Sequence, residues 1–240
     1  MKHSILAILC LALTFSILAQ EEVKFEALDK LTITADLYFS DSAAPLIILC
    51  HQANSSRGEY KNIAPKLVDL GFNCLALDLR NGGESNGVTN ETLPDAVAKK
   101  FPTGLIYCEQ DILAGMEYAS KTLKKENVIL IGSSYSASLN LMIGAYDERV
   151  LAIVAFSPGE YISDLSISTY VQYIAKPTFA TGSKTEITDV KNMMTGMNAN
   201  YLTMFLPKGE GEHGTEALDE SNENHKEYWD ALEKFLTNKI

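Results

Sequence analysis

The pattern of apolar and polar residues near the start of the chain predicts a β-hairpin. Apolar and polar residues alternate through Val23–Ala27 and again through Leu31–Phe39, and the polar pair Asp29-Lys30 lies between them. Alternation of this kind is typical of strands with one face buried and the other in water. We therefore expect these two segments to pair as antiparallel strands at the edge of a sheet.

Farther along the chain, apolar runs alternate with segments whose apolar residues recur at helical spacing. The apolar runs indicate strands buried on both faces. Strands are predicted at Leu46–Cys50, Asn73–Asp78, Val128–Ile131, Val150–Phe156, Pro177–Thr181 and Tyr201–Leu206. Helices are predicted at Tyr60–Leu70, Leu105–Leu123, Tyr135–Tyr146, Asp189–Met197 and Asn224–Lys239.

This alternation of strands and helices predicts an α/β fold. Right-handed crossovers would build a mostly parallel central sheet with helices on both faces. Functional residues of such sheets gather at the carboxyl ends of the strands, so the loops that follow the strands are the ones to search. One long segment, Asn86–Gly104, is expected to be irregular and to form a short lid or pocket wall.

Composition and charge limit the classes of partner. The chain has 240 residues, of which 46% are hydrophobic and 21% are charged, and its formal net charge is −11. These proportions are those of an ordinary globular protein. A strongly acidic chain is a poor ligand for nucleic acid or for an anionic membrane surface, since both recruit Lys and Arg. We therefore expect neither nucleic acid nor an anionic membrane surface as a partner.

The first 19 residues predict a secretory signal peptide. Lys2 supplies a positive start, Ile5–Leu18 is almost entirely apolar, and Ala19 is a small residue before the expected cut. A membrane anchor is the alternative, but the apolar run is shorter than the roughly 20 residues that span a bilayer. We therefore expect export to the periplasm or the extracellular space, and one domain over residues 20–240.

Three cysteines remain after the predicted signal peptide. They are Cys50, Cys74 and Cys108, and the first two lie in predicted strands. The count is odd and no C-x-x-C motif occurs, so neither a disulfide framework nor a zinc site is indicated. We expect all three to be small buried core residues.

The turn between the Val128–Ile131 strand and the next helix carries a candidate nucleophile. Its sequence, Gly132-Ser133-Ser134-Tyr135-Ser136, is close to the G-x-S-x-G nucleophile elbow. The elbow is so tight that the residues two before and two after the nucleophile must be small. Ser134 meets this requirement through Gly132 and Ser136, whereas Ser133 would have Ile131 at the first position. Ser134 is therefore the predicted nucleophile.

A serine needs a general base to act near neutral pH. The histidines after the signal segment are His51, His213 and His225. His213 lies in the polar loop GEGEHGTEAL after the last predicted strand, which opens at the catalytic edge of the sheet. His225 lies at the start of the final helix, where a solvated surface role is expected. We therefore predict His213 as the base.

The third member of a triad orients the histidine and stabilises its charged form. Glu186 is the first carboxylate after the Pro177–Thr181 strand and is the favoured candidate. Asp189 and Asp164 remain alternatives, although Asp189 suits the first turn of the following helix. The order Ser, acid, His along the chain is the order found in α/β-hydrolases.

Four segments together resemble the α/β-hydrolases, near the dienelactone hydrolase-like and small-esterase branches. They are LIILCHQANSSRGEY, ALDLRNGGESNG, VILIGSSYSAS and LPKGEGEHGTEAL. The resemblance implies an oxyanion hole made by the backbone N–H of Gln52 or Ala53 and that of Tyr135. It also implies that His51 structures the loop after the third strand and is not the base.

The sequence departs from the family pattern at three positions. Ser134 stands where dienelactone hydrolases have cysteine, Thr185-Glu186 stands where an aspartate is common, and Ser136 replaces the second glycine of the elbow. The resemblance implies hydrolysis of a small ester or acyl substrate through an acyl-enzyme, with no metal or organic cofactor. The alternatives are a non-catalytic binding protein of the cell envelope, or a peptidase, thioesterase or lactonase with the same triad.

Overall fold

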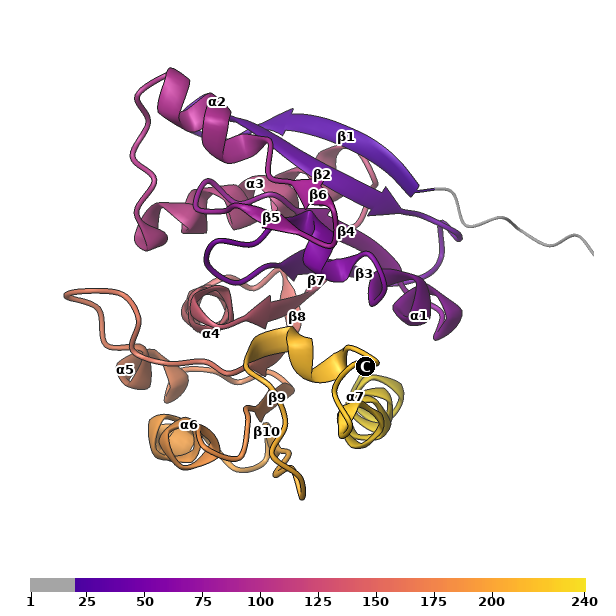
Figure 1. The fold of residues 1–240 in the computed structure, drawn as a ribbon, viewed down its shortest axis with the longest axis vertical. Helices are drawn as coiled ribbons and strands as arrows, with labels where there is room; N and C mark the ends of the chain where they lie inside the picture. The colour runs from indigo at the N-terminus through magenta and orange to yellow at the C-terminus, as the bar shows by residue number, and fades with distance from the viewer. Residues whose placement is uncertain (1–19) are drawn as a thin grey trace, which may run out of the picture.

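The computed structural model describes residues 20–240, so the predicted signal peptide lies outside the described residues. Eight strands form one sheet in the order β1-β2-β4-β3-β7-β8-β9-β10 (Figure 1). The strands are β1 Gln20–Glu26, β2 Thr32–Tyr38, β3 Leu46–Cys50, β4 Asn73–Leu77, β7 Val128–Ser133, β8 Val150–Phe156, β9 Thr178–Thr181 and β10 Leu202–Met204.

The sheet is antiparallel at one edge and parallel elsewhere. Strand β1 pairs antiparallel with β2, and β2 pairs antiparallel with β4. From β4 through β3, β7, β8 and β9 to β10, each strand is parallel to the next. The predicted N-terminal hairpin and the mostly parallel sheet are therefore confirmed.

Helices cover both faces of the sheet (Figure 1). They are α1 Ala64–Asp69, α2 Thr92–Ala98, α3 Cys108–Lys121, α4 Tyr135–Tyr146, α5 Ile167–Val171, α6 Ile187–Met193 and α7 His225–Lys239. Short 3-10 turns are η1 Arg57–Tyr60, η2 Leu105–Tyr107, η3 Met194–Gly196 and η4 Gly214–Leu218.

The two faces of the sheet belong to two separate apolar clusters. In β3, Leu46, Ile48 and Cys50 pack in the cluster that contains residues of α3 and α4, whereas Ile47 and Leu49 pack in the cluster that contains residues of α1 and α7. This alternation follows from the two-residue period of a strand. Burial on both sides explains why the central strands are continuous apolar runs, and the predicted α/β class is confirmed.

The expectation of an irregular segment at Asn86–Gly104 is wrong. The chain forms a small antiparallel pair, β5 Glu84–Ser85 and β6 Val88–Thr89, followed by helix α2. Pro94 is the third residue of α2, where the missing N–H costs no intrahelical hydrogen bond. Only Thr92 and Ala96 of this helix are buried, so it has no apolar stripe for a sequence pattern to reveal.

Cys50, Cys74 and Cys108 are buried and carry free thiols, as predicted. Burial raises the pKa of each thiol above its ordinary value, so the three remain protonated at neutral pH. Within residues 20–240, every helix is too short or too polar to cross a lipid bilayer.

Candidate active site

The turn from β7 into α4 is a strained strand-to-helix elbow with Ser134 at its tip. Ser134 has φ +60° and ψ −124°, a conformation that a residue with a side chain adopts only when its surroundings impose it. A Cβ added at Gly132 would lie 2.6 Å from the Ala137 Cα, so only glycine fits there. The Ser134 N–H donates to the Phe156 carbonyl at 2.9 Å and ties the elbow to the end of β8.

The serine that replaces the second glycine of the elbow has partners of its own. Ser136 Oγ donates to the Cys50 carbonyl at 2.6 Å and accepts from the Ser133 N–H at 3.0 Å. The Ser136 side chain is fully buried. Its hydroxyl therefore links the elbow to the end of β3, where the predicted oxyanion loop begins.

The structure brings Glu186 and His213 together. His213 Nδ1 lies 2.5 Å from Glu186 Oε1. The second carboxylate oxygen accepts from the Ser157 hydroxyl at 2.7 Å and from the Ser183 N–H at 3.0 Å. Three donors thus surround the Glu186 carboxylate, one at Oε1 and two at Oε2, and hold it in a single orientation.

These contacts change the ionisation of both groups. Burial acts to raise the pKa of Glu186, but the hydrogen bonds from His213, Ser157 and Ser183 outweigh it and hold the pKa at about 2. The hydrogen bond with Glu186 raises the pKa of His213 above its ordinary value, and burial opposes this only in part. The pair therefore stabilises the imidazolium, which is what a general base needs after it takes a proton.

The His213 loop is docked against the elbow by its next two residues. The Gly214 N–H donates to Ser157 Oγ at 2.9 Å, and the Thr215 N–H donates to Ser133 Oγ at 3.0 Å. Gly214 has φ +64°, and a Cβ there would lie 2.2 Å from Ser133 Oγ. Among the described residues no hydrogen bond joins Ser134 to His213. Catalytic hydrogen bonds are often long before substrate binds.

The predicted oxyanion loop follows β3. The Gln52 N–H donates to the Glu59 carboxylate at 3.0 Å, so this donor is already occupied. The N–H groups of Ala53 and Tyr135 have no hydrogen-bond partner among the residues described. Ala53 therefore remains as the candidate donor from this loop, together with Tyr135 at the N-terminus of α4.

The remaining sequence candidates lie away from His213. Asp189 is an exposed residue in the first turn of α6, and Asp164 is exposed in the loop after β8. His225 begins α7, with Nδ1 at 2.8 Å from the Asn222 carbonyl. His51 is fully buried, and its Nε2 accepts from the Leu79 N–H at 3.0 Å. Burial lowers the pKa of His51, which suits a neutral residue that holds two loops together.

Two residues of this cluster were not singled out from the sequence. Ser157, the first residue after β8, bridges Glu186 and the Gly214 N–H. The Tyr161 hydroxyl donates to the Ser157 carbonyl at 3.0 Å. Burial raises the pKa of Tyr161, with Glu186 adding to the effect and Ser134 opposing it, so its phenol stays protonated beside the site. The signal for Ser157 was its place at the carboxyl end of a buried strand.

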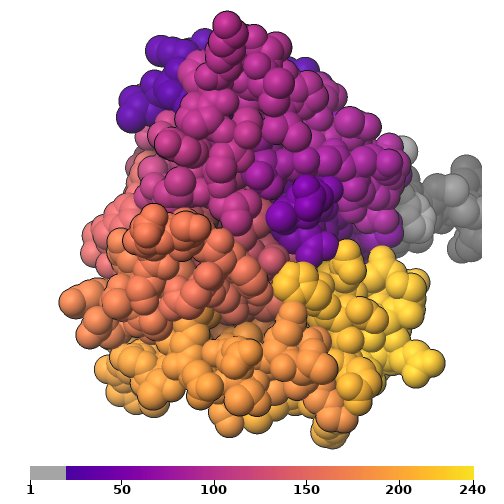
Figure 2. All heavy atoms as spheres, turned by 60° about the vertical axis from the view of Figure 1, so that its left-hand side comes forward, coloured from indigo at the N-terminus to yellow at the C-terminus, as the bar shows by residue number. Residues whose placement is uncertain are grey.

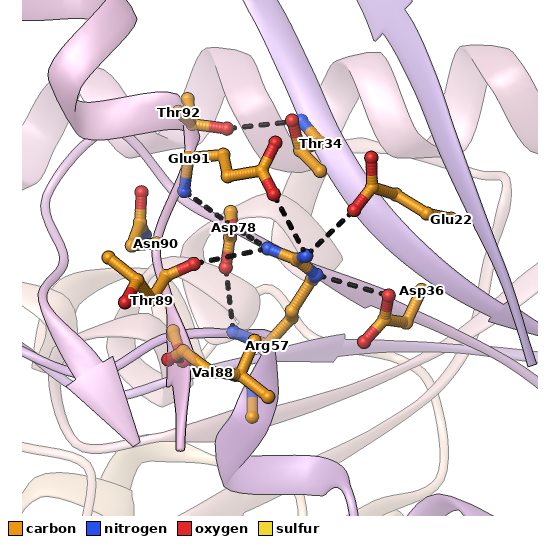
Figure 3. Close-up of polar contacts among 12 residues, drawn as sticks. Glu22, Thr34, Asp36, Arg57, Asp78, Val88, Thr89, Asn90, Glu91 and Thr92 are labelled. Carbon is orange, nitrogen blue, oxygen red and sulfur yellow. Dashed lines mark hydrogen bonds and ion pairs between the residues drawn. The ribbon is translucent and has the colours of Figure 1, made fainter. Parts of the chain in front are cut away.

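A second charged cluster lies around Arg57, the first residue of η1 (Figure 3). The guanidinium contacts four carboxylates and is 7% exposed. Its distances to carboxylate oxygens are 3.0 Å to Asp36, 2.5 Å to Asp78, 2.9 Å to Glu22 and 3.3 Å to Glu91. These contacts join β1, β2, the end of β4 and the start of α2 to the loop after β3. We call these five residues the Arg57 cluster.

Segments far apart in the sequence meet at this edge of the sheet. In Figure 2 the dark purple surface of the segment after β3 lies between the magenta segment that follows β4 and the yellow C-terminal part. A cavity of about 860 Å³ opens beside η1 and η4, with Glu59 and Thr215 on its wall. A second cavity, of about 330 Å³, lies between Tyr161, Glu186 and Met193. Glu186 lines the second cavity, and neither cavity is lined by Ser134 or His213.

A family model described as the alpha/beta hydrolase fold matches residues 45–224. The matched region contains Ser134, Glu186 and His213, together with both loops that hold the His213–Glu186 pair.

Two fungal transferases are similar in sequence. The acyltransferase drtE of Aspergillus calidoustus is 27% identical over 150 residues, which cover 62% of this chain and 46% of that protein. The polyketide transferase ATR5 of Stachybotrys chlorohalonatus is 25% identical over 154 residues, which cover 62% of this chain and 48% of that protein. The matched region spans about half the length of these curated relatives.

Solved structures of prokaryotic enzymes share the fold. The Pyrococcus furiosus esterase Pf2001 superposes with a TM-score of 0.72 at 17% identity, covering 92% of this chain and 93% of that one. A dienelactone hydrolase from Anabaena variabilis also gives a TM-score of 0.72, at 14% identity, covering 93% and 99%. At these identities the likeness concerns the fold alone.

Proposed function

Because the chain belongs to the α/β-hydrolase fold family, we propose that it is a serine hydrolase that cleaves carboxylic esters. The observation that carries the proposal is the 2.5 Å contact between His213 and Glu186, on a loop docked against the strained elbow of Ser134. A nucleophile, a base and an orienting acid are the three groups that acyl transfer requires.

The proposed reaction proceeds through an acyl-enzyme. Ser134 Oγ attacks the ester carbonyl while His213 takes the hydroxyl proton, and the His213 imidazolium then protonates the leaving alcohol. Water attacks the acyl-enzyme in the second half, with His213 again as base. Glu186 keeps Nδ1 protonated and stabilises the imidazolium. The proposed steps use side chains, backbone N–H groups and water, and require no cofactor.

Two backbone N–H groups would hold the oxyanion. Tyr135 follows the nucleophile at the start of α4, where the helix dipole favours a negative charge. The Ala53 N–H is the second donor, because Glu59 already occupies the Gln52 N–H. Loss of one such donor would lower kcat by about 10²–10³-fold.

Acyl transfer to an acceptor other than water is the second candidate. Both curated relatives are named as transferases, one an acyltransferase and one a polyketide transferase. The same acyl-enzyme would serve, with an alcohol or amine replacing water in the second step. A rise in ester product when alcohol is added would favour transfer over hydrolysis.

We also propose that the protein is exported after removal of residues 1–19. The support is the sequence pattern of Lys2, the apolar run Ile5–Leu18 and Ala19. N-terminal sequencing of the protein recovered from its native host tests this proposal. A mature N-terminus at or near Gln20 is the expected result, and an intact Met1 would contradict it.

The first experiment is labelling of residues 20–240 with a fluorophosphonate, followed by mass mapping. We expect one label per molecule on Ser134, because an activated serine reacts with this probe and an ordinary one does not. Ser134→Ala should not label, and its kcat for p-nitrophenyl esters should fall by about 10⁶-fold, as for other triads.

Two results would reject the hydrolase proposal. One is a folded protein that stays unlabelled under conditions where a control esterase reacts, which would favour a binding protein with this fold. The other is labelling that persists in Ser134→Ala. A panel of p-nitrophenyl esters, thioesters, lactones and peptide anilides then separates the esterase from the thioesterase, lactonase and peptidase alternatives.

A further inference from the structure

Glu59 is a buried carboxylate that the proposed mechanism leaves unused. It lies in η1, is 6% exposed, and makes hydrogen bonds to two different loops. It accepts from the Gln52 N–H at 3.0 Å and from the Thr215 hydroxyl. We propose that Glu59 is a positioning residue that holds the oxyanion loop and the His213 loop in register around Ser134; this inference rests on the proposed function.

The contact with Thr215 acts on the base. Thr215 lies two residues after His213, and its N–H donates to Ser133 Oγ at 3.0 Å. Glu59 accepts from its hydroxyl, so the elbow holds the Thr215 N–H and η1 holds the Thr215 hydroxyl. Thr215 thereby fixes the loop that carries His213 both to the turn that carries Ser134 and to η1.

The contact with Gln52 acts on the oxyanion loop. Both polar groups of the Gln52 backbone are occupied, because its carbonyl lies 2.7 Å from His51 Nδ1 while its N–H donates to Glu59. With the Gln52 N–H turned to Glu59, the Ala53 N–H is the donor left to this loop. Glu59 therefore selects which of two adjacent N–H groups can serve the oxyanion.

The charge of Glu59 has a second consequence. The negative carboxylate adds to the effects of Glu186 and Glu216 that favour the charged form of His213. Among the described carboxylates near His213, Glu59 is the one that also bridges the two loops from a buried position. Substitutions at Glu59 can therefore separate the effect of its hydrogen bonds from the effect of its charge.

Glu216 offers a matched control. Gln52 Nε2 donates to Glu216 Oε1 at 2.7 Å, so this exposed pair joins the same two loops at the surface. Glu216→Gln removes a carboxylate that also favours the His213 imidazolium. The control removes a similar charge without removing a buried bridge.

The test compares Glu59→Gln, Glu59→Met and Glu216→Gln at a pH where His213 is neutral. In Glu59→Gln the amide oxygen can accept from Gln52 and the amide NH₂ can donate to the Thr215 hydroxyl. We expect Glu59→Gln and Glu216→Gln to keep kcat within about threefold of the parent, because both loops stay linked. Glu59→Met removes both bonds, and we expect kcat to fall by about 10²-fold with little change in KM, as for misplaced catalytic groups.

A partner series isolates the bond to the His213 loop. Thr215→Val deletes the hydroxyl and should lower kcat, whereas Thr215→Ser keeps it and should restore kcat. In the Glu59→Met background, Thr215→Val should add little further loss, because the bond is already gone.

Hydrogen exchange of the Thr215 backbone N–H provides a readout that needs no activity. We expect Glu59→Met to accelerate this exchange at least tenfold, because Glu59 accepts from the Thr215 hydroxyl at a buried position. Glu216→Gln should leave it unchanged, because Glu216 accepts from the Gln52 side chain instead. If the parent protein neither labels nor hydrolyses esters, the proposed function fails, while faster exchange in Glu59→Met still supports the anchoring role.

Three results would overturn the inference. In the first, Glu59→Met leaves kcat and Thr215 exchange unchanged. In the second, it lowers the melting temperature but not the kcat of the folded fraction, which would mark a purely structural residue. In the third, Glu216→Gln lowers kcat as much as Glu59→Met does.

Discussion

Two of the carboxylate–cation clusters that follow the sheet strands, the His213–Glu186 pair and the Arg57 cluster, differ in exposure and in the nature of the cation. The Glu186 and His213 side chains are 28% and 40% exposed, whereas the Arg57 and Asp78 side chains are 7% and 0% exposed. Imidazole gains and loses a proton near neutral pH, but guanidinium does not. The first cluster can therefore move a proton, and the second can only hold loops in place.

The energetics of the two clusters differ in the same way. Burial raises the pKa of Asp78 even though Arg57 and backbone N–H groups oppose it. At Asp78, loss of hydration therefore raises the pKa by more than the hydrogen bonds and the charge of Arg57 lower it. At Glu186 the hydrogen bonds outweigh the effect of burial, and the pKa falls to about 2. Removal of one partner from the Arg57 cluster is therefore expected to destabilise the fold, whereas the His213–Glu186 pair is tuned for ionisation.

The largest effect that separates the clusters is expected for Glu186→Gln. Glutamine cannot accept from both His213 and the Ser157 and Ser183 donors without turning its NH₂ toward one of them, so the imidazole loses its fixed tautomer. We expect kcat for an ester to fall by about 10⁴-fold with little change in stability. Steady-state kinetics and thermal melts check this, with Asp189→Asn, in the first turn of the helix that follows Glu186, as the control.

Either of two results would break the comparison here. A Glu186→Gln enzyme with near-parental kcat would show that the pair is structural. A loss of activity in Asp189→Asn equal to that in Glu186→Gln would move the acid to Asp189.

The next effect is on stability and concerns Arg57→Met. Removal of the guanidinium leaves Asp36 and Asp78 buried without their cation, which typically costs about 3–5 kcal/mol. Arg149→Met is the matched control, because its pair with Asp147 is partly exposed and should cost at most about 1 kcal/mol. Urea unfolding measures both. Equal losses in the two variants would contradict the structural role assigned to the Arg57 cluster.

The sequence predicted most of the fold because the central elements are buried all round. The runs Leu46–Cys50 and Val150–Phe156 and the helix Tyr135–Tyr146 coincide with β3, β8 and α4. Helix α2 was missed because it buries only Thr92 and Ala96 and exposes Val97. Its sequence therefore lacks apolar residues at helical spacing.

The candidate site was predictable only where local geometry restricts residue type. Ser134 could be chosen because the elbow accepts only small neighbours, and the structure shows that Gly132 has no room for a Cβ. The occupation of the Gln52 N–H by Glu59 was not predictable. It depends on how η1 folds back onto the loop seven residues earlier, and nothing in the spacing of these two residues requires it.

A smaller effect is expected for Ser136→Ala. The variant keeps a small residue in the elbow but leaves the buried Ser133 N–H without its partner. The Cys50 carbonyl loses one of its donors and keeps the Tyr60 hydroxyl. We expect a loss of about 1–3 kcal/mol in the free energy of unfolding. We expect kcat to change by less than about tenfold, which corresponds to less than about 1.4 kcal/mol in the activation free energy. The exposed Ser42→Ala should change stability by less than about 0.5 kcal/mol.

The smallest expected effect comes from ionisation of the His213–Glu186 pair. As the pH rises, stability should fall and activity should rise. The pKa of His213 is raised above its ordinary 6.5, so the fold favours the charged imidazole. Its stabilising contribution is complete below pH 6.5 and disappears as the pH rises through the raised pKa. The loss should be less than about 1 kcal/mol because the pair is partly exposed.

Activity should move the other way across the same window, because catalysis needs the neutral base. We expect kcat/KM to rise with a midpoint above pH 6.5, and the free energy of unfolding to fall slightly over the same range. Glu186→Gln should reduce both the stability loss and the elevation of the midpoint, because Glu186 is the largest of the effects that favour the imidazolium. Arg57→Met should alter neither trend, since guanidinium keeps its charge throughout. A kcat/KM midpoint below 6.5, or a stability that rises across this window, would mean that the pair does not favour the imidazolium, and the distinction between the two clusters would fail.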